Sequence, residues 1–218
     1  QDELSFDKFN KNYSTTYQVM ATRDFKNQVM TDPNMVLPLA PALEKGYPQI
    51  KNAVVTTYPE PHIFNYGDQQ IKKTGLTVGG NFFDMFSFKG IKGNVSSVMN
   101  DPLSIALTQS TATSFFGKDE PIGKVLRIDN STDMKVTAIV ADPPGNSTIQ
   151  FDFIKSFNFS DPDVKQQMNE WVNSSWKVYL QAAPGTKPET LEKIVNTVKK
   201  QHDLNDAIST YFVFPMNK

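Results

Sequence analysis

The alternation of apolar and polar residues predicts a β-α-β unit near the start of the chain. Thr16 to Phe25 is rich in β-forming residues at its start and is predicted to be a strand, and Ala53 to Tyr58 is predicted to be the next. Between them a helix is expected to begin at Pro38 and to stop at Gly46. Its apolar stripe consists of Leu39, Ala42 and Leu43. At this length we expect the two strands to be parallel neighbours joined by a right-handed crossover.

The middle of the chain has a different pattern, with short strands, glycine-bearing turns and brief helices. Ile63 to Gln70 and Ile71 to Val78 are predicted to form a hairpin around Gly67-Asp68. Thr108 is expected to cap a helix that ends at Gly117. That helix has an apolar face of Ala112, Phe115 and Phe116. The remaining elements predicted here are a helical turn at Asn81 to Phe86 and strands at Ile105 to Leu107, Val125 to Asp129 and Met134 to Val140.

After the sequence Asp142-Pro143-Pro144-Gly145-Asn146 the pattern returns to longer elements. A helix is expected to start at Asp161-Pro162, with Val164, Met168 and Trp171 on one side. Thr186 and Glu189 have the spacing of a capping box. The helix that follows has an apolar stripe of Leu191, Ile194, Val195 and Val198. The predicted strands are Gln150 to Phe157, Lys177 to Ala182 and Thr210 to Pro215.

This order of elements predicts an α+β fold with two lobes. A porter-like lobe is expected to combine residues 1–59 with residues 148–218, as two β-α-β type halves from the two ends of the chain. Residues 60–147 are expected to form a second, β-rich lobe inserted between them. The chain has 218 residues, which is enough for one large core or two small ones.

Composition removes several classes of function. The chain has 22 basic and 23 acidic residues and no basic stripe, so we expect no nucleic acid partner. It has no cysteine, which excludes disulfides and thiolate metal sites. No stretch approaches the eighteen or so apolar residues that cross a bilayer. Residues 1–10 lack a signal-peptide pattern, and the chain starts on a polar stretch rather than a Met, which is expected of a mature or trimmed product or of a vector-derived start.

Few residues suggest chemistry, and we expect no catalytic, cofactor or metal site. The two histidines, His62 and His202, are not accompanied by the Gly-x-Ser-x-Gly motif of a hydrolase. The acidic pairs Asp161/Asp163 and Asp119/Glu120 lack the spacing of a calcium loop. Gly79-Gly80 has too few glycines for a phosphate-binding loop and is expected to form a tight turn.

An aromatic cluster is the most conspicuous feature of the sequence. It comprises Phe82, Phe83, Met85, Phe86 and Phe88. Such a cluster is either the wall of an apolar ligand pocket or the core of the middle lobe, joined by Phe115 and Phe116. Because cores are far more common than pockets, we favour the core.

Four segments, in order, resemble MacB-like periplasmic core domains of FtsX-related ABC-transporter permeases. The first is FDKFNKN at residues 6–12, followed by YQV at residues 17–19. The second is VGGNFFDMFSFKG at residues 78–90. The third is NDPLSIALTQSTA at residues 100–112, followed by FG at 116–117 and DEPIGK at 119–124. The fourth is VTAIVADPPGNS at residues 136–147, followed by FDF at 151–153.

The resemblance implies a role outside the cytoplasm and without catalysis. The domain would lie at the periplasmic face of the inner membrane, between the first two transmembrane helices of its own permease. Its partners would be those helices, a second permease copy, a cytoplasmic ABC ATPase and an envelope protein. The absence of a Walker motif implies that ATP is hydrolysed elsewhere and that its energy reaches the domain as movement, called mechanotransmission. Gln1 and Lys218 would then emerge on the same side of the porter-like lobe.

Within the resembled family, a regulatory or lipoprotein-extracting permease remains as open as an efflux permease, and two functions outside it also remain open. A stand-alone envelope module that binds a ligand or protein would have an open pocket over Phe82 to Phe88. A hydrolase would have a cleft in which His62 or His202 meets carboxylates.

Overall fold

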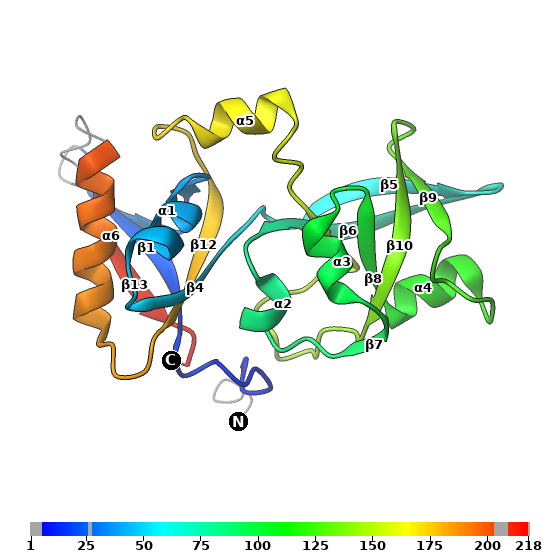
Figure 1. Ribbon diagram of the computed structural model, residues 1–218, viewed down its shortest axis with the longest axis horizontal. Helices are drawn as coiled ribbons and strands as arrows, with labels where there is room; N and C mark the ends of the chain where they lie inside the picture. Colours follow the sequence, from blue (N-terminus) through cyan, green and yellow to red (C-terminus); the bar gives the residue numbers. More distant parts are fainter. Residues whose placement is uncertain (1–5, 26–27, 203–208, 218) are drawn as a thin grey trace. The chain divides into compact units, whose positions relative to one another are not determined.

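The chain folds into two units, each built from two separate stretches of sequence (Figure 1). The computed structural model of the protein describes residues 6–25, 28–202 and 209–217. Unit 1 contains the described residues up to Asn10 together with Thr57–Asn158. Unit 2 contains Lys11–Thr56 and the described residues from Phe159 onward. Both units combine helices and strands, so the predicted α+β fold class is confirmed.

The main sheet of unit 2 takes strands from both of its sequence segments. These strands are β1 (Thr16–Phe25), β4 (Ile50–Thr56), β12 (Ser174–Ala182) and β13 (Ser209–Pro215). Their order is β4-β12-β1-β13, and each neighbouring pair is antiparallel. Helices α1 (Leu39–Gly46) and α6 (Pro188–His202) contact each other and pack against β4 and β13. Two β-α-β halves interleaved in this way give a ferredoxin-like arrangement.

The prediction that the first two strands are neighbours is wrong, because β12 lies between β1 and β4. Leu180 of β12 pairs with Tyr17 on one side and with Ala53 on the other. Strands β1 and β4 are therefore parallel to each other but one strand apart. Every residue from Val178 to Ala182 is buried. A strand covered on both faces belongs in the interior of a sheet, which explains the central place of β12.

Three smaller elements complete unit 2. Strand β2 (Gln28–Asp32) pairs with β1, and β3 (Met35–Val36) pairs with β12. The expected helix after Asp161 is α5 (Pro162–Met168), and the Asp161 carboxylate accepts hydrogen bonds from the N–H groups of Asp163 and Val164. No residue of α5 is buried, and Val164 and Met168 on its predicted apolar side are half-buried.

Unit 1 contains a closed β-barrel. Its strands are β5 (Glu60–Tyr66), β6 (Gln69–Gly79), β8 (Ser104–Thr108), β9 (Val125–Ile128), β10 (Thr132–Val140) and β11 (Phe153–Ser156). Pairing runs in the ring β5-β6-β11-β8-β10-β9 and returns to β5. The predicted hairpin at Gly67-Asp68 is confirmed as β5–β6.

Strand β11 closes this ring, which moves the expected lobe boundary. It pairs in parallel with β6 and antiparallel with β8. The sequence assigned residues 148–158, residues 57–59 and the N-terminal residues up to Asn10 to the porter-like lobe, whereas the structure groups those of them that it describes with unit 1. Without β11 the edges of β6 and β8 would be unpaired, and closing a sheet removes such edges.

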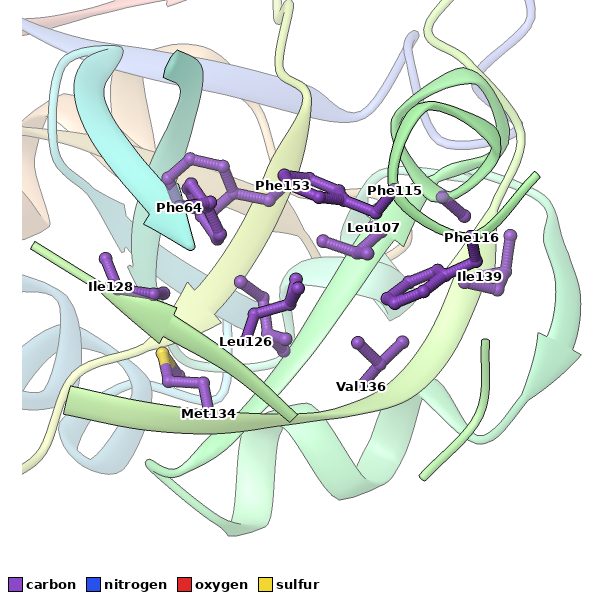
Figure 2. Close-up of a cluster of buried hydrophobic side chains, with 12 residues drawn as sticks. Phe64, Leu107, Phe115, Phe116, Leu126, Ile128, Met134, Val136, Ile139 and Phe153 are labelled. Carbon is purple, nitrogen blue, oxygen red and sulfur yellow. The ribbon is translucent and has the colours of Figure 1, made fainter. Parts of the chain in front are cut away.

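The barrel interior is filled by apolar side chains (Figure 2). The cluster consists of Phe64, Ile105, Leu107, Ala112, Phe115, Phe116, Leu126, Ile128, Met134, Val136, Ile139 and Phe153. The ring centroids of Phe64 and Phe153 are 4.9 Å apart, and Phe115 of helix α4 (Gln109–Phe116) lies 5.9 Å from Phe64. Helix α4 begins and ends as predicted, because the Thr108 side chain accepts from the N–H of Thr111 and Gly117 adopts φ 59°. These caps direct the phenylalanines of α4 into the barrel.

Three short elements lie outside the ring. Helix α2 (Phe82–Met85) corresponds to the predicted helical turn. Strand β7 (Gly90–Gly93), which pairs with β10, and helix α3 (Val95–Asn100) were not predicted. Strand β7 begins and ends with glycine, and α3 follows it with few apolar residues, so the apolar pattern gave no signal for either.

Candidate functional site

The aromatic cluster is largely buried in unit 1. Phe82 and Met85 are fully buried, and Phe86 and Phe88 are nearly so. Phe83 is half-buried. The rings of Phe82 and Phe88 stack with centroids 5.8 Å apart, and Phe86 lies 5.1 Å from Phe82. The side chains therefore fill one another's space, as in a core.

This cluster packs against residues far away in the sequence. The ring of Phe151, which precedes β11, lies 4.9 Å from that of Phe88, edge to face. Phe9 lies 5.5 Å from Phe88. The expected partners Phe115 and Phe116 belong to the barrel interior instead. The expectation that all these phenylalanines form one core is therefore wrong, and unit 1 has a second apolar cluster next to its N-terminal segment.

A small cavity lies beside the exposed side of Phe83. It is lined by Asn81, Phe83, Asp84, Val95, Ser96, Met99 and Asn100, and its volume is about 130 Å³. Pockets for small molecules usually measure several hundred Å³. This cavity is smaller than that, and of the five cluster residues only Phe83 lines it.

The N-terminal segment, Phe6–Asn10, is bound to unit 1 through a buried aspartate that the sequence did not single out. Asp7 is 3% exposed and has a left-handed backbone with φ 56°. Its carboxylate accepts hydrogen bonds from the N–H and hydroxyl of Thr148, at 3.0 and 2.7 Å, and from the Ser147 hydroxyl at 3.5 Å. Its own N–H donates to the Asn146 carbonyl at 2.9 Å. The donors lie about 140 positions away, so local spacing could not reveal the site.

His62 lies in a charged cluster with Glu60, Asp129 and Lys155. Its Nδ1 is 2.5 Å from Asp129 Oδ2, and its Nε2 is 3.8 Å from Glu60 Oε2. In a Ser-His-Asp site the second ring nitrogen faces a hydroxyl nucleophile. Here both nitrogens face carboxylates, an arrangement suited to ion pairing.

Burial and mutual contacts shift the pKa values of two members of this charged cluster. Burial acts to raise the pKa of Asp129, but hydrogen bonds from His62 and the Ile63 N–H outweigh it and lower that pKa. Burial lowers the pKa of Lys155, while Glu60 and Asp129 act to raise it. The cluster links β5, which carries Glu60 and His62, to β11, which carries Lys155.

The other residues considered from sequence have structural partners. The ring of His202, at the end of α6, stacks on Trp171 with centroids 3.8 Å apart. His62 and His202 belong to different units. Glu120 forms an ion pair with Lys92. Gly80 follows β6 with φ 80°, as expected of a tight turn. Within the described ranges, no group of three or more potential ligands is arranged for a metal ion, and no helix is long and apolar enough to span a membrane.

The chain enters and leaves each unit at neighbouring positions. In unit 1, the Thr57 N–H donates to Thr77 of β6 and the Phe157 N–H donates to Val78, the next residue. In unit 2, the N–H of Met216 donates to the carbonyl of Thr16 at 3.1 Å, and Tyr17 pairs with Pro215. The start of the first strand and the end of the last strand of unit 2 therefore lie side by side. The predicted positions of Gln1 and Lys218 themselves fall outside the described residues.

Comparison with known proteins identifies relatives of this arrangement. The family description "MacB-like periplasmic core domain" matches residues 1–198. Among curated proteins, none matches the chain. A domain assigned to a permease protein of Porphyromonas gingivalis has a similar structure, with a TM-score of 0.77 and 21% identity over 94% of this chain and 91% of that one.

Two further solved structures are similar. The periplasmic region of MacB from Actinobacillus actinomycetemcomitans has a TM-score of 0.67 and 13% identity, over 94% of this chain and 90% of that one. The extracellular domain of the ABC-type transporter YknZ from Gram-positive bacteria has a TM-score of 0.65 and 14% identity, over 91% of this chain and 99% of that one. At these identities the likeness shows a common fold.

Proposed function

Because this chain belongs to the family of MacB-like periplasmic core domains, we propose that it transmits movement from a membrane-embedded ABC permease to the periplasm. A cytoplasmic ATPase drives the movement, and the domain itself breaks no bonds. Its site of action is the periplasmic face of the inner membrane. Its partners are its own transmembrane helices, a second permease copy, the ATPase and an envelope protein.

The adjacent ends of the sheet in unit 2 carry this proposal. A domain held between two membrane helices must receive both of its chain ends from the same side. The hydrogen bond from Met216 to Thr16 and the pairing of Tyr17 with Pro215 bring the two ends of the sheet together. The first and last strands of unit 2 therefore begin and end side by side, as a domain attached to the membrane at both of its ends requires.

The charged and apolar groups of the two units support a transmitting role over a catalytic one. His62 faces carboxylates on both ring nitrogens. Phe82, Phe86 and Phe88 of the aromatic cluster are buried. A closed barrel and a ferredoxin-like sheet are stiff, densely packed bodies, which respond to force by moving as wholes.

Spin-label distances in the intact transporter test the proposal without knowledge of the cargo. The chain has no cysteine, so Thr210→Cys in β13 and Val125→Cys in β9 each introduce one label site into this domain. Both positions are exposed. Distances between the two permease copies would be measured with the ATPase bound, without nucleotide and after trapping with ATP and vanadate.

We expect trapping to shift the distance distribution at both sites. The same complex with an inactive ATPase serves as the control and should show no shift. Identical distributions in the trapped and nucleotide-free states, with hydrolysis intact, would contradict the proposal.

A further inference from the structure

We infer that the N-terminal segment, Phe6–Asn10, conveys the movement of the preceding chain to unit 1, with Asp7 as the positioning residue that attaches it. The inference rests on the proposed function and extends it. It assigns the two ends of the domain to different units, because the segment is bound to unit 1 whereas β13 belongs to unit 2.

The N-terminal segment is attached at Asp7 by buried hydrogen bonds to a carboxylate. Two donors, the N–H and the hydroxyl of Thr148, converge on one carboxylate that is 3% exposed, and the Ser147 hydroxyl, which donates to the Ile149 carbonyl at 2.9 Å, lies 3.5 Å from it. Hydrogen bonds to a charged group are stronger than those between neutral groups. A buried carboxylate also requires these donors, since leaving it unpaired is costly. Detachment of the segment would therefore break the hydrogen bonds to Asp7 and also leave the Thr148 donors without their acceptor.

Contacts on the far side of the segment hold it against the aromatic cluster. Asn10 is 1% exposed, and its side chain oxygen accepts a hydrogen bond from the Ser87 hydroxyl at 3.2 Å. The Phe9 ring lies 5.5 Å from that of Phe88. The segment is thus bound at two places, to the loop before β11 and to the cluster after α2.

The loop that receives Asp7 leads directly to the strand that closes the barrel. Ser147 and Thr148 precede Ile149 and Phe151, which are both buried, and β11 begins at Phe153. Because β11 pairs with both β6 and β8, a pull on Asp7 acts on the barrel at its closing strand. The next residue after the segment, Lys11, begins unit 2.

Hydrogen exchange on the chain of residues 1–218 tests the attachment itself. Glycine adopts φ 56° without strain, so Asp7→Gly removes the carboxylate and keeps the backbone. Thr148→Val removes one donor at nearly constant shape. We expect the amides of Asn10 and Thr148 to exchange about tenfold faster or more in Asp7→Gly, and less so in Thr148→Val. Asp68→Gly, in the exposed hairpin turn of the same unit, is the matched control and should leave them unchanged. Unchanged exchange in Asp7→Gly would overturn the attachment.

The same measurement on the permease–ATPase complex tests transmission. With wild-type chain, trapping with ATP and vanadate should alter exchange in β11 of unit 1 and in β13 of unit 2. In Asp7→Gly the change in β11 should be lost and that in β13 retained. If the change in β11 persists in Asp7→Gly, the role of Asp7 is overturned and the proposed function is not. A wild-type complex in which neither strand responds overturns the proposed function and the role that depends on it, even where the first measurement shows the segment attached.

Discussion

At the scale of single residues, Gly75 shows how closely the barrel is packed at its seam. It pairs with Phe153 where β6 meets β11. A Cβ atom at this position would lie 2.3 Å from the Phe153 carbonyl oxygen and 2.6 Å from its ring. Both atoms belong to the closing strand, so the added carbon has no space to occupy. Only glycine allows the two backbones to approach this closely.

Gly75→Ala is therefore expected to lower the free energy of unfolding by about 1–3 kcal/mol, the usual cost of overpacking. Denaturant titration followed by fluorescence or circular dichroism would measure the change. Gly46→Ala is the control, because a Cβ there meets no atom within 4 Å and alanine favours the helix. Equal stabilities for the two variants would show that the seam can relax.

Caps were predictable residue by residue, whereas the Asp7 site was not. Thr108, Gly117 and Asp161 act on groups within four positions of themselves, so their role follows from local spacing. Asp7 meets its donors only after the chain has folded around some 140 intervening residues. The partner of a buried carboxylate at that separation depends on the topology.

At the scale of elements, the turn between α3 and β8 depends on an ionised carboxylate. Asp101 follows α3, and its side chain accepts hydrogen bonds from the Leu103 N–H at 3.0 Å and the Ser104 hydroxyl at 2.8 Å. The bond from Leu103, and then that from Ser104, lowers the pKa of Asp101 below its ordinary value of 3.8. The folded protein thus binds a proton here less readily than the unfolded chain does.

A lowered pKa in the folded state means that this contribution to stability is complete above pH 3.8 and is lost as the pH falls further. The difference in unfolding free energy between wild type and Asp101→Ala should therefore be constant near neutral pH and shrink below that value. Asp101→Asn keeps an acceptor oxygen but cannot titrate, so its stability should lack this acid-dependent loss. A wild-type-to-alanine difference that is independent of pH would contradict the assignment.

Most elements were predictable because each has its own periodicity and stop signals. The stripe from Leu191 to Val198 is buried in α6 as expected. Gln150 to Phe157 is a shorter strand than predicted, since β11 begins at Phe153. Just before it, Asp152 donates its N–H to the Thr74 carbonyl and accepts from the Thr108 N–H, so tertiary hydrogen bonds also tie down the residues that lie outside the strand.

At the scale of the whole molecule, the division into two units predicts that damage to one core stays local. Phe82 is fully buried in the aromatic cluster of unit 1, and its contacts with Phe86, Phe88 and Phe151 lie within that unit. Removing its ring leaves a cavity, which typically costs about 3–5 kcal/mol.

Phe82→Ala should accordingly weaken the hydrogen-exchange protection of β6 and β11 much more than that of β1 and β12. Phe83→Ala, the neighbouring half-buried ring, should have a smaller effect of the same kind. Loss of protection to the same extent in both units would show that they unfold as one cooperative body.

The sequence by itself determined most of the elements of this protein, its fold class and its family resemblance, because periodicity, caps and turn residues act within a few positions. Only the tertiary structure decided which strands are neighbours. Strand β12 separates β1 from β4, β11 closes the barrel and Asp7 finds Thr148, since each of these pairings joins distant segments. The physical reason for these pairings is burial. A strand edge and a buried carboxylate need hydrogen-bond partners, an apolar face needs cover from water, and the partner in each case is the segment that folding brings next to it.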